Sequence, residues 1–137
     1  MQISKLDHLV LTVYDIETTC IFYASVLGMK VIEFGEGRKA LILDGLKINL
    51  HEFGKEYQPH AKYPSPGSAD LCFYSDLNMK QVIDHLLEKQ VKIIDGPGQR
   101  TGAKGPILSV YIKDPDGNLI EIATQLTTST PDQNNAA

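Results

Sequence analysis

The chain has 137 residues, of which 42% are hydrophobic and 22% are charged, the composition of a soluble globular chain about one domain long. No run approaches the roughly 18 consecutive apolar residues of a membrane span, and the amino terminus shows no signal-peptide block. A net charge of −4 offers no basic face for phosphates, so we expect a small-molecule partner and no nucleic acid. Cys20 and Cys72 lack a Cys-x-x-Cys spacing, which indicates reduced thiols and a cytoplasmic location.

The first half of the chain is predicted to form a strand, a helix and three further strands. A stretch rich in β-branched and aromatic residues at 6–14 indicates the first strand. Asp15 is expected to cap the helix that follows, and Gly28 can end this helix in the left-handed conformation. Turn signals then separate the remaining strands, which are expected at 30–34, 40–43 and 47–53.

The second half repeats this order. Asp76 is the expected cap of its helix, as Asp15 is in the first half. Its strands are expected at 71–75, 91–94, 107–112 and 119–124. A half of about 60 residues would leave much of its sheet face uncovered, so two halves are expected to pair. The alternative is a coincidence between two common strand–helix patterns.

The expected domain organisation follows from this duplication. We predict a single domain over residues 1–126, with a first module at about 4–53 and a second at about 70–125. The Pro- and Gly-containing linker at 54–69 would allow the modules to pair within one chain or across a dimer. Residues 127–137 are polar and are expected to be disordered.

Two of the four histidines lie in predicted strands. Because strand side chains alternate, His8 and His51 both point away from the apolar face that the helices are expected to cover. The same alternation places Asp70 and Glu121 on the corresponding face of the second half. Each of these four residues comes from the first or last strand of its half.

If the two sheets curl towards each other, these four side chains line a cup and can converge. Two imidazoles and two carboxylates suit a divalent metal such as Zn, Ni, Co, Mn or Fe better than calcium or a cluster. Taken singly, a strand histidine is more often an ordinary polar residue, and an acidic residue is more often solvated. The prediction of a metal site therefore depends on the duplication, which brings the four residues to one face.

Three segments carry a family resemblance: Asp-His-Leu-Val-Leu-Thr-Val at 7–13, Phe-Tyr-Ala-Ser-Val-Leu-Gly-Met at 22–29, and Asp-Pro-Asp-Gly-Asn-Leu-Ile-Glu at 114–121. Over about residues 4–125 the chain resembles the vicinal oxygen chelate superfamily, typified by glyoxalase I. The resemblance implies an α+β fold in which paired βαβββ modules form a cup-shaped sheet around a metal that binds two neighbouring substrate oxygens. The Pro-Asp-Gly turn would also fix the register that aims Glu121 inward.

The resemblance also implies a ligand set, because relatives of glyoxalase I commonly use His, Glu, His and Glu in chain order. His8 and Glu121 match this pattern as metal ligands, whereas His51 stands where Glu is common and Asp70 where His is common. Asp70 is shorter than Glu. If it does not reach the metal, His8, His51 and Glu121 would leave a three-ligand site with open positions, which resembles that of ferrous oxygenases.

Four further side chains are candidate substrate contacts. Cys72 and Tyr74 would face the cup, with core packing as the alternative for Cys72. The segment Gly96–Pro106 is expected to be a mobile loop in which Arg100 and Lys104 are either solvated or close over an anionic substrate. Its glycine-rich start lacks the G-x-G-x-x-G spacing and leads into a strand, which argues against a dinucleotide site.

The resemblance implies an enzyme of the lactoylglutathione lyase type, which isomerises a hemithioacetal or a related carbonyl adduct through an enediolate. The metal would act as a Lewis acid on two adjacent oxygens. Glu121 is the expected base, with Asp70 as its catalytic partner, and glutathione is a candidate cosubstrate. Because the chain is short, we expect a homodimer.

Other activities on the same fold remain as alternatives. One is extradiol dioxygenation of a catechol, against which the aspartate at position 70 argues, since a histidine is expected there. A second is thiol transfer to an antibiotic epoxide, and a third is a non-catalytic protein that sequesters a ligand. Four metal-capable side chains favour an enzyme over the binding module.

Overall fold

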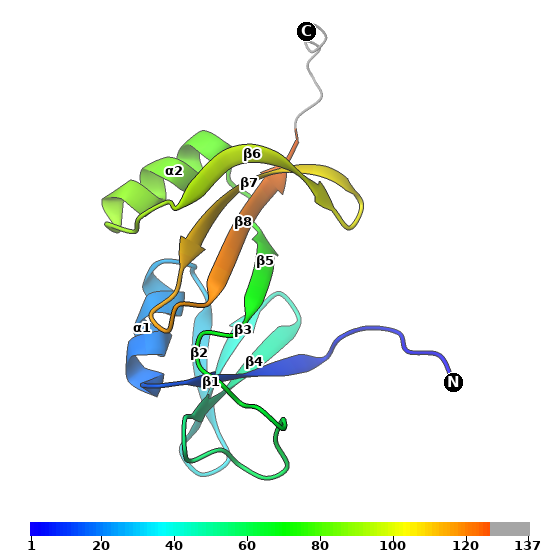
Figure 1. The fold of residues 1–137 in the computed structure, drawn as a ribbon, viewed down its shortest axis with the longest axis vertical. Helices are drawn as coiled ribbons and strands as arrows, with labels where there is room; N and C mark the ends of the chain where they lie inside the picture. The colour runs from blue at the N-terminus through cyan, green and yellow to red at the C-terminus, as the bar shows by residue number, and fades with distance from the viewer. Residues whose placement is uncertain (127–137) are drawn as a thin grey trace, which may run out of the picture. The chain divides into compact units, whose positions relative to one another are not determined.

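The computed structural model describes residues 1–126 (Figure 1), so the disordered tail predicted for 127–137 lies outside the described residues. The chain divides into two compact units. The first contains Met1–Ala69 together with Lys113–Leu119, and the second contains Asp70–Ile112 and the strand segment that starts at Ile120. The predicted linker therefore belongs to the first unit. Neither helix of the described chain has the length and hydrophobicity that crossing a membrane requires.

Both units contain a four-stranded sheet and one helix, and their topologies are the same. The first unit consists of β1 (His8–Val13), α1 (Ile16–Ser25), β2 (Lys30–Phe34), β3 (Arg38–Leu43) and β4 (Leu46–Glu52), in the sheet order β1-β4-β3-β2. The second unit consists of β5 (Asp70–Tyr74), α2 (Met79–Glu88), β6 (Asp95–Gly102), β7 (Gly105–Lys113) and β8 (Leu119–Gln125), in the order β5-β8-β7-β6. The predicted α+β class and the duplication are confirmed.

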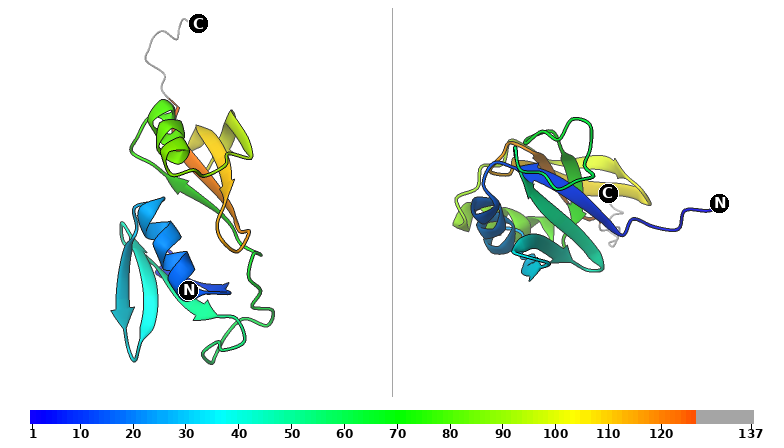
Figure 2. Two further views of the ribbon diagram at one scale, coloured as in Figure 1. Left: turned by 90° about the vertical axis from the view of Figure 1, so that its left-hand side faces the viewer. Right: turned by 90° about the horizontal axis from the view of Figure 1, so that it is seen from below.

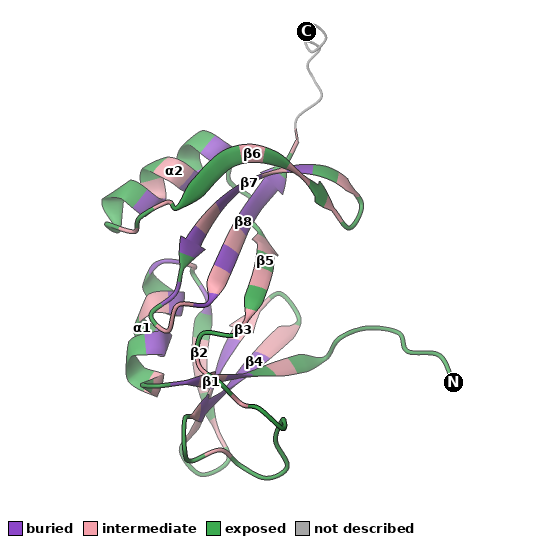
Figure 3. Ribbon diagram, in the orientation of Figure 1, coloured by how far each residue is buried: buried purple, intermediate pink, exposed green. Residues whose placement is uncertain are grey.

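In the first unit, α1 covers one face of the sheet, as the left view of Figure 2 shows. Strand side chains alternate between faces, so the apolar residues of neighbouring strands gather beneath the helix. Leu41, Ile48 and Tyr23 are buried there, and Figure 3 shows the buried segments in purple. The predicted cap is confirmed, because the Asp15 carboxylate accepts a hydrogen bond of 3.1 Å from the backbone N–H of Glu17. Gly28, just past the helix, has a φ of 70°.

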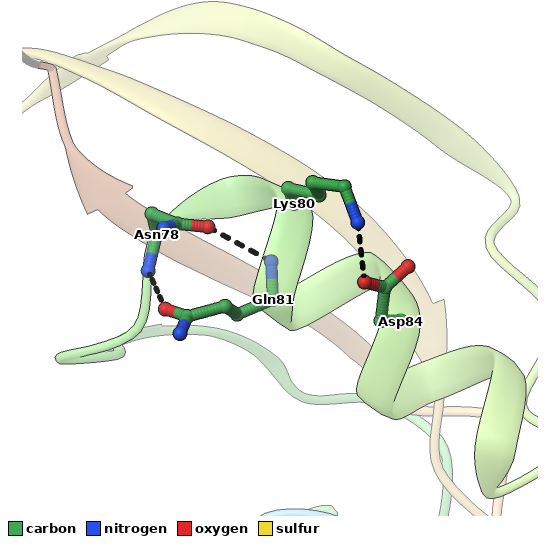
Figure 4. Close-up of polar contacts among 4 residues, drawn as sticks. All are labelled: Asn78, Lys80, Gln81 and Asp84. Atoms are coloured by element: carbon green, nitrogen blue, oxygen red, sulfur yellow. Dashed lines mark hydrogen bonds and ion pairs between the residues drawn. The ribbon is translucent and has the colours of Figure 1, made fainter.

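In the second unit, the helix begins later than predicted. Its N-cap is Asn78 instead of Asp76. The Asn78 side chain accepts a hydrogen bond of 2.9 Å from the Gln81 N–H, and the Gln81 side chain accepts one of 3.0 Å from the Asn78 N–H (Figure 4). This reciprocal capping box satisfies two backbone donors, whereas an aspartate cap at position 76 has no such partner at the start of the helix. Lys80 and Asp84 form an exposed ion pair one turn further on.

The strand predicted at 91–94 and the loop predicted at 96–106 are also corrected. Residues Asp95–Gly102 form β6, which pairs antiparallel with β7 and places Arg100 opposite Ile107. The register shifts between Asp95 and Gly98, and this irregularity accommodates the Gly-Pro-Gly sequence at the edge of the sheet. Gly96 is required there because a Cβ at this position would lie 2.5 Å from the Ser109 carbonyl oxygen.

The Asp-Pro-Asp-Gly-Asn turn between β7 and β8 belongs to the first unit. Asp114 is 6% exposed, and its carboxylate accepts hydrogen bonds from the Tyr23 hydroxyl at 2.7 Å and from the Asn118 side chain at 2.8 Å. It also accepts two backbone N–H bonds of 2.9 Å within the turn, from Asp116 and Asn118. In turn, the Asn118 side-chain oxygen accepts a bond of 2.8 Å from the Ala69 N–H. This buried network fixes the turn that leads into β8 and therefore into Glu121.

Candidate functional site

His8 is the first residue of β1 and its side chain is about half exposed. Its Nδ1 lies 2.9 Å from the Asp7 carboxylate, and this hydrogen bond lowers the pKa of Asp7. A carboxylate on Nδ1 is the usual way in which proteins orient a metal-binding imidazole, because it leaves Nε2 as the ligand atom. The His8 ring is therefore held by a carboxylate at Nδ1, an arrangement in which Nε2 can act as a ligand atom.

His51 lies on the same sheet face as His8, but not beside it. In the parallel pairing of β1 with β4, His8 is opposite Lys47 and His51 is opposite Thr12. This offset of four residues corresponds to about 13 Å along the strands, whereas a metal lies roughly 2 Å from each of its nitrogen ligands. This register gives no support to the prediction that both histidines bind one metal ion. The polar β4 residue nearer to His8 is Asn49, which lies opposite Val10.

The surroundings of His51 are also unsuited to a metal cation. The residue is 4% exposed, and its Nε2 lies 3.5 Å from Nη2 of Arg38. Burial and the Arg38 charge lower the pKa of His51, although Glu56 has an opposing influence. The Tyr57 ring packs edge-on against the imidazole, with centroids 5.4 Å apart. His51 is thus a neutral imidazole beside a fixed positive charge.

Asp70, Cys72 and Glu121 interact within the second unit. β5 and β8 are neighbours, and the Cys72 thiol hydrogen-bonds to Glu121. Although Cys72 is exposed as a residue, partial burial of its sulfur, the Glu121 carboxylate and, to a smaller extent, Asp70 raise its pKa to about 11. Among residues 1–126, no three His, Cys, Asp or Glu side chains gather closely enough to hold a metal ion. Tyr74, on the same face of β5 by alternation, is largely exposed.

We expect Cys72 to react slowly with iodoacetamide in chelator-treated protein. With a pKa of about 11 instead of 9.0, its thiolate fraction at pH 8 should be about 100-fold lower than that of an ordinary thiol. Peptide mass spectrometry of the alkylated protein measures this rate. Glu121→Gln should accelerate the reaction because it removes a neighbouring negative charge, and Glu88→Gln on α2 is the control. Alkylation of the unchanged protein at the rate of a free thiol would contradict the expectation.

Arg100 and Lys104 belong to the β6–β7 hairpin instead of a mobile loop. The Arg100 guanidinium lies 3.4 Å from the Asp95 carboxylate and 5.4 Å from the centre of the Tyr111 ring. Lys104 is exposed in the hairpin turn and, with Tyr74, lines a hollow of about 860 Å³ in the second unit. Arg100 is not among the residues that line it, so the two cations do not share a pocket.

The first unit contains a cavity of about 580 Å³ that the sequence did not reveal. It lies between β1, the end of β4 and the segment 59–69. Its strand residues include His51, Val10 and Thr12, and the segment contributes mainly proline, tyrosine, serine and alanine side chains. The segment was predicted only as an irregular connection. Its proline content was the available signal, but such a signal does not show which face the segment will cover.

A second feature missed from the sequence is a group of buried polar atoms beside His51. Nε of Arg38, Oδ1 of Asn49 and Nδ1 of His51 are each buried without a hydrogen-bond partner in the described chain. Arg38 begins β3, two residues before the strand predicted at 40–43. Because buried polar atoms are normally paired, this group indicates where a ligand would be accommodated.

The comparisons with known proteins agree on one superfamily. The model of the Glyoxalase/Bleomycin resistance protein/Dioxygenase superfamily matches residues 5–122. Virulence protein STM3117 of Salmonella typhimurium is 52% identical over 123 residues, which cover 90% of this chain and 85% of the relative. Its crystal structure covers 92% of this chain and 100% of that chain with a TM-score of 0.90 at 51% identity. Glyoxalase domain-containing protein RDO1 of Mycosarcoma maydis is 49% identical, with coverages of 90% and 70%.

More distant similarities include proteins whose names state a reaction. Metallothiol transferase FosB of Lysinibacillus sphaericus is 27% identical over 124 residues, 90% of this chain and 84% of the relative. The crystal structure of lactoylglutathione lyase from Agrobacterium tumefaciens has a TM-score of 0.68 at 19% identity, covers 90% of this chain and 96% of its own, and shares the fold alone. The family match spans most of the chain, and the two sheets repeat one topology. The chain therefore belongs to the Glyoxalase/Bleomycin resistance protein/Dioxygenase superfamily.

Proposed function

We propose that the protein is a divalent-metal-dependent enzyme of the glyoxalase I type. It would isomerise a hemithioacetal of glutathione, or a related small carbonyl adduct, to a 2-hydroxyacyl product. The observation that carries the proposal is the Asp7–His8 hydrogen bond, which orients an exposed imidazole with Nε2 available for a metal. Membership of the superfamily and the shared fold of lactoylglutathione lyase support it.

The proposed metal ligands are His8, Asp70 and Glu121, a donor set that suits a divalent metal of the borderline type. His51 is left out of this set because of its register and its Arg38 neighbour. When bound, the metal would supply Lewis acidity at two adjacent substrate oxygens.

The chain's own residues would then move the proton. Glu121 is proposed to take it from the carbon beside the carbonyl and return it to the neighbouring carbon, with Asp70 assisting on the other side. In this proposal the thiol of the reaction belongs to the substrate adduct, and Cys72 hydrogen-bonds to Glu121.

A second candidate is thiol transfer to an anionic epoxide. The likeness to metallothiol transferase FosB supports it, as do Arg38 and Lys47, which have no carboxylate within ion-pair distance in the described chain. These unpaired cations would suit a negatively charged substrate.

Metal analysis and a direct assay test the first proposal. We expect protein incubated with Zn, Ni, Co, Mn or Fe to retain about one ion per chain and to convert the methylglyoxal–glutathione hemithioacetal. His8→Ala should lose the ion, whereas the control His85→Gln on α2 should keep it. Absence of any retained metal would refute both candidates. Metal retention with thiol transfer to fosfomycin and no isomerisation would favour the second.

A further inference from the structure

We propose that the first unit contains a binding site for a carboxylate that carries a hydroxyl or amino group on its neighbouring carbon, formed by Arg38, Asn49 and His51. The inference rests on the proposed function in one respect: it takes the bound carboxylate to be part of the enzyme's substrate. The site itself lies within one unit and needs no metal.

The three side chains share one face of the sheet. Asn49 pairs with Ala40 in the antiparallel β3–β4 ladder, and Arg38 lies two residues before Ala40 on β3. By alternation, Arg38 therefore faces the same side as Asn49 and as His51, which lies two residues further along β4. The contact of 3.5 Å between Arg38 Nη2 and His51 Nε2 supports this placement.

The unpaired atoms define which chemistry fits. Nε of Arg38 is a buried donor, Oδ1 of Asn49 is a buried acceptor, and Nδ1 of His51 can act as either according to its tautomer. Asn49 and His51 are 7% and 4% exposed. A carboxylate without a hydroxyl or ammonium group would satisfy Arg38 but would offer no donor to Oδ1 of Asn49. A carboxylate with an adjacent hydroxyl or ammonium group would supply both an acceptor and a donor.

The charges on this face favour an anion. The Arg38 guanidinium lies 4.2 Å from the centre of the Tyr57 ring and 4.9 Å from that of Phe34, and Lys47 Nζ lies 3.6 Å from the Phe34 centre. Neither cation has a carboxylate within 4 Å in the part of the chain that is described, whereas Lys39 pairs with Glu33 at 3.1 Å. The aromatic rings hold the positive groups in place but do not neutralise them. A bound carboxylate would supply the missing counter-charge.

The cavity of the first unit provides space for the rest of the ligand. Of the three residues of the polar group, His51 lines the 580 Å³ cavity, whereas Arg38 and Asn49 do not. The cavity is also lined by apolar and aromatic residues such as Val10, Pro59 and Tyr63. Its other polar lining residues are Thr12, His60, Ser65, Ser68 and Asn118. Such a mixed lining suits a small organic molecule whose charged end is bound by the polar group.

Calorimetric titration of chelator-treated protein tests the proposal, with lactate, propanoate and inorganic phosphate as probes. Lactate and propanoate differ only in the 2-hydroxyl group. Phosphate carries O–H groups at neutral pH but lacks the planar carboxylate and the carbon skeleton, so it tests whether these are needed. We expect saturable binding of lactate, and binding of propanoate and phosphate that is at least about tenfold weaker. Such a difference is what one buried hydrogen bond of about 1.4 kcal/mol produces.

Three variants assign the binding to these residues. Arg38→Met should weaken lactate binding at least about tenfold, and Arg38→Lys, which keeps the charge without the guanidinium fork, should weaken it less. Asn49→Leu should abolish the preference for lactate over propanoate. Lys39→Met is the control because Lys39 lies next to Arg38 but on the opposite face, and it should leave binding unchanged. Far-UV circular dichroism checks the fold of each variant.

Several results would overturn the proposal. They are the absence of saturable lactate binding to the unchanged protein, equal affinity for lactate and phosphate, and unchanged lactate binding in folded Arg38→Met or Arg38→Lys. Because no metal is present in these titrations, their failure leaves the metal-dependent activity untouched. Loss of metal-dependent activity would likewise leave the titrations valid.

Discussion

Asp114→Ala is expected to lower the free energy of unfolding by about 3 kcal/mol or more, because it removes the acceptor at the centre of a buried network. The Asp114 carboxylate accepts bonds from the Tyr23 hydroxyl, the Asn118 side chain and two backbone N–H groups. Tyr23 and Asn118 are at most 1% exposed, so water cannot readily replace the lost acceptor. The cost is the desolvation of donors left unpaired, to which a small cavity adds.

Two further variants show how much of this loss comes from one hydrogen bond of the network and how much any lost carboxylate would cost. Tyr23→Phe removes one donor and leaves Asp114 its other three, so we expect a loss of only about 1 kcal/mol. Asp84→Ala removes an exposed carboxylate that pairs with Lys80, and such pairs contribute at most about 1 kcal/mol. The expected order of destabilisation is therefore Asp114→Ala, then Tyr23→Phe, then Asp84→Ala.

Urea denaturation followed by far-UV circular dichroism and by tyrosine fluorescence measures these differences, since the chain has no tryptophan. The chain has two compact units, so the two signals should be compared for a single transition before free energies are assigned. An Asp114→Ala protein as stable as Asp84→Ala would show that the turn does not stabilise the first unit.

The elements that the sequence predicted well are those with strong local signals. Asp15 and Gly28 bracket α1 through short-range hydrogen bonding and backbone conformation, which neighbouring residues determine. The start of α2 was misplaced because Asp76 and Asn78 are both good caps, and only the reciprocal bond with Gln81 distinguishes them. β6 was missed because its Gly-Pro-Gly segment has weak strand propensity, and the pairing that orders it comes from β7.

For the candidate site, too, local features could be predicted from the sequence and long-range ones could not. Alternation correctly placed His8 and His51 on one face of the sheet, because it depends only on the strand itself. Sliding β4 by two residues along β1 would preserve that face, so alternation cannot determine how far apart the two histidines lie. The register depends on backbone pairing between strands that are distant in sequence. For the same reason, the grouping of Arg38 with His51 became visible only in the paired sheet.

Glu121→Gln is expected to lower kcat/KM for hemithioacetal isomerisation by about 10³-fold, if Glu121 is the base as proposed. Glutamine has nearly the same shape as glutamate but cannot accept the substrate proton at neutral pH. The assay uses protein loaded with metal, and metal content is measured on the same samples. Glu88→Gln, which changes an exposed glutamate of α2, is the matched control and should retain full activity.

The two roles proposed for Glu121 can be distinguished by combining the two measurements. If Glu121 acts mainly as the base, Glu121→Gln retains its metal and loses both turnover and the exchange of the substrate C–H proton with deuterated solvent. If its main role is to bind the metal, metal content falls together with activity, as it should for His8→Ala. A metal-loaded Glu121→Gln protein with kcat/KM within about threefold of the unchanged enzyme would exclude Glu121 as the base, because loss of a positioned general base costs at least about 10²-fold.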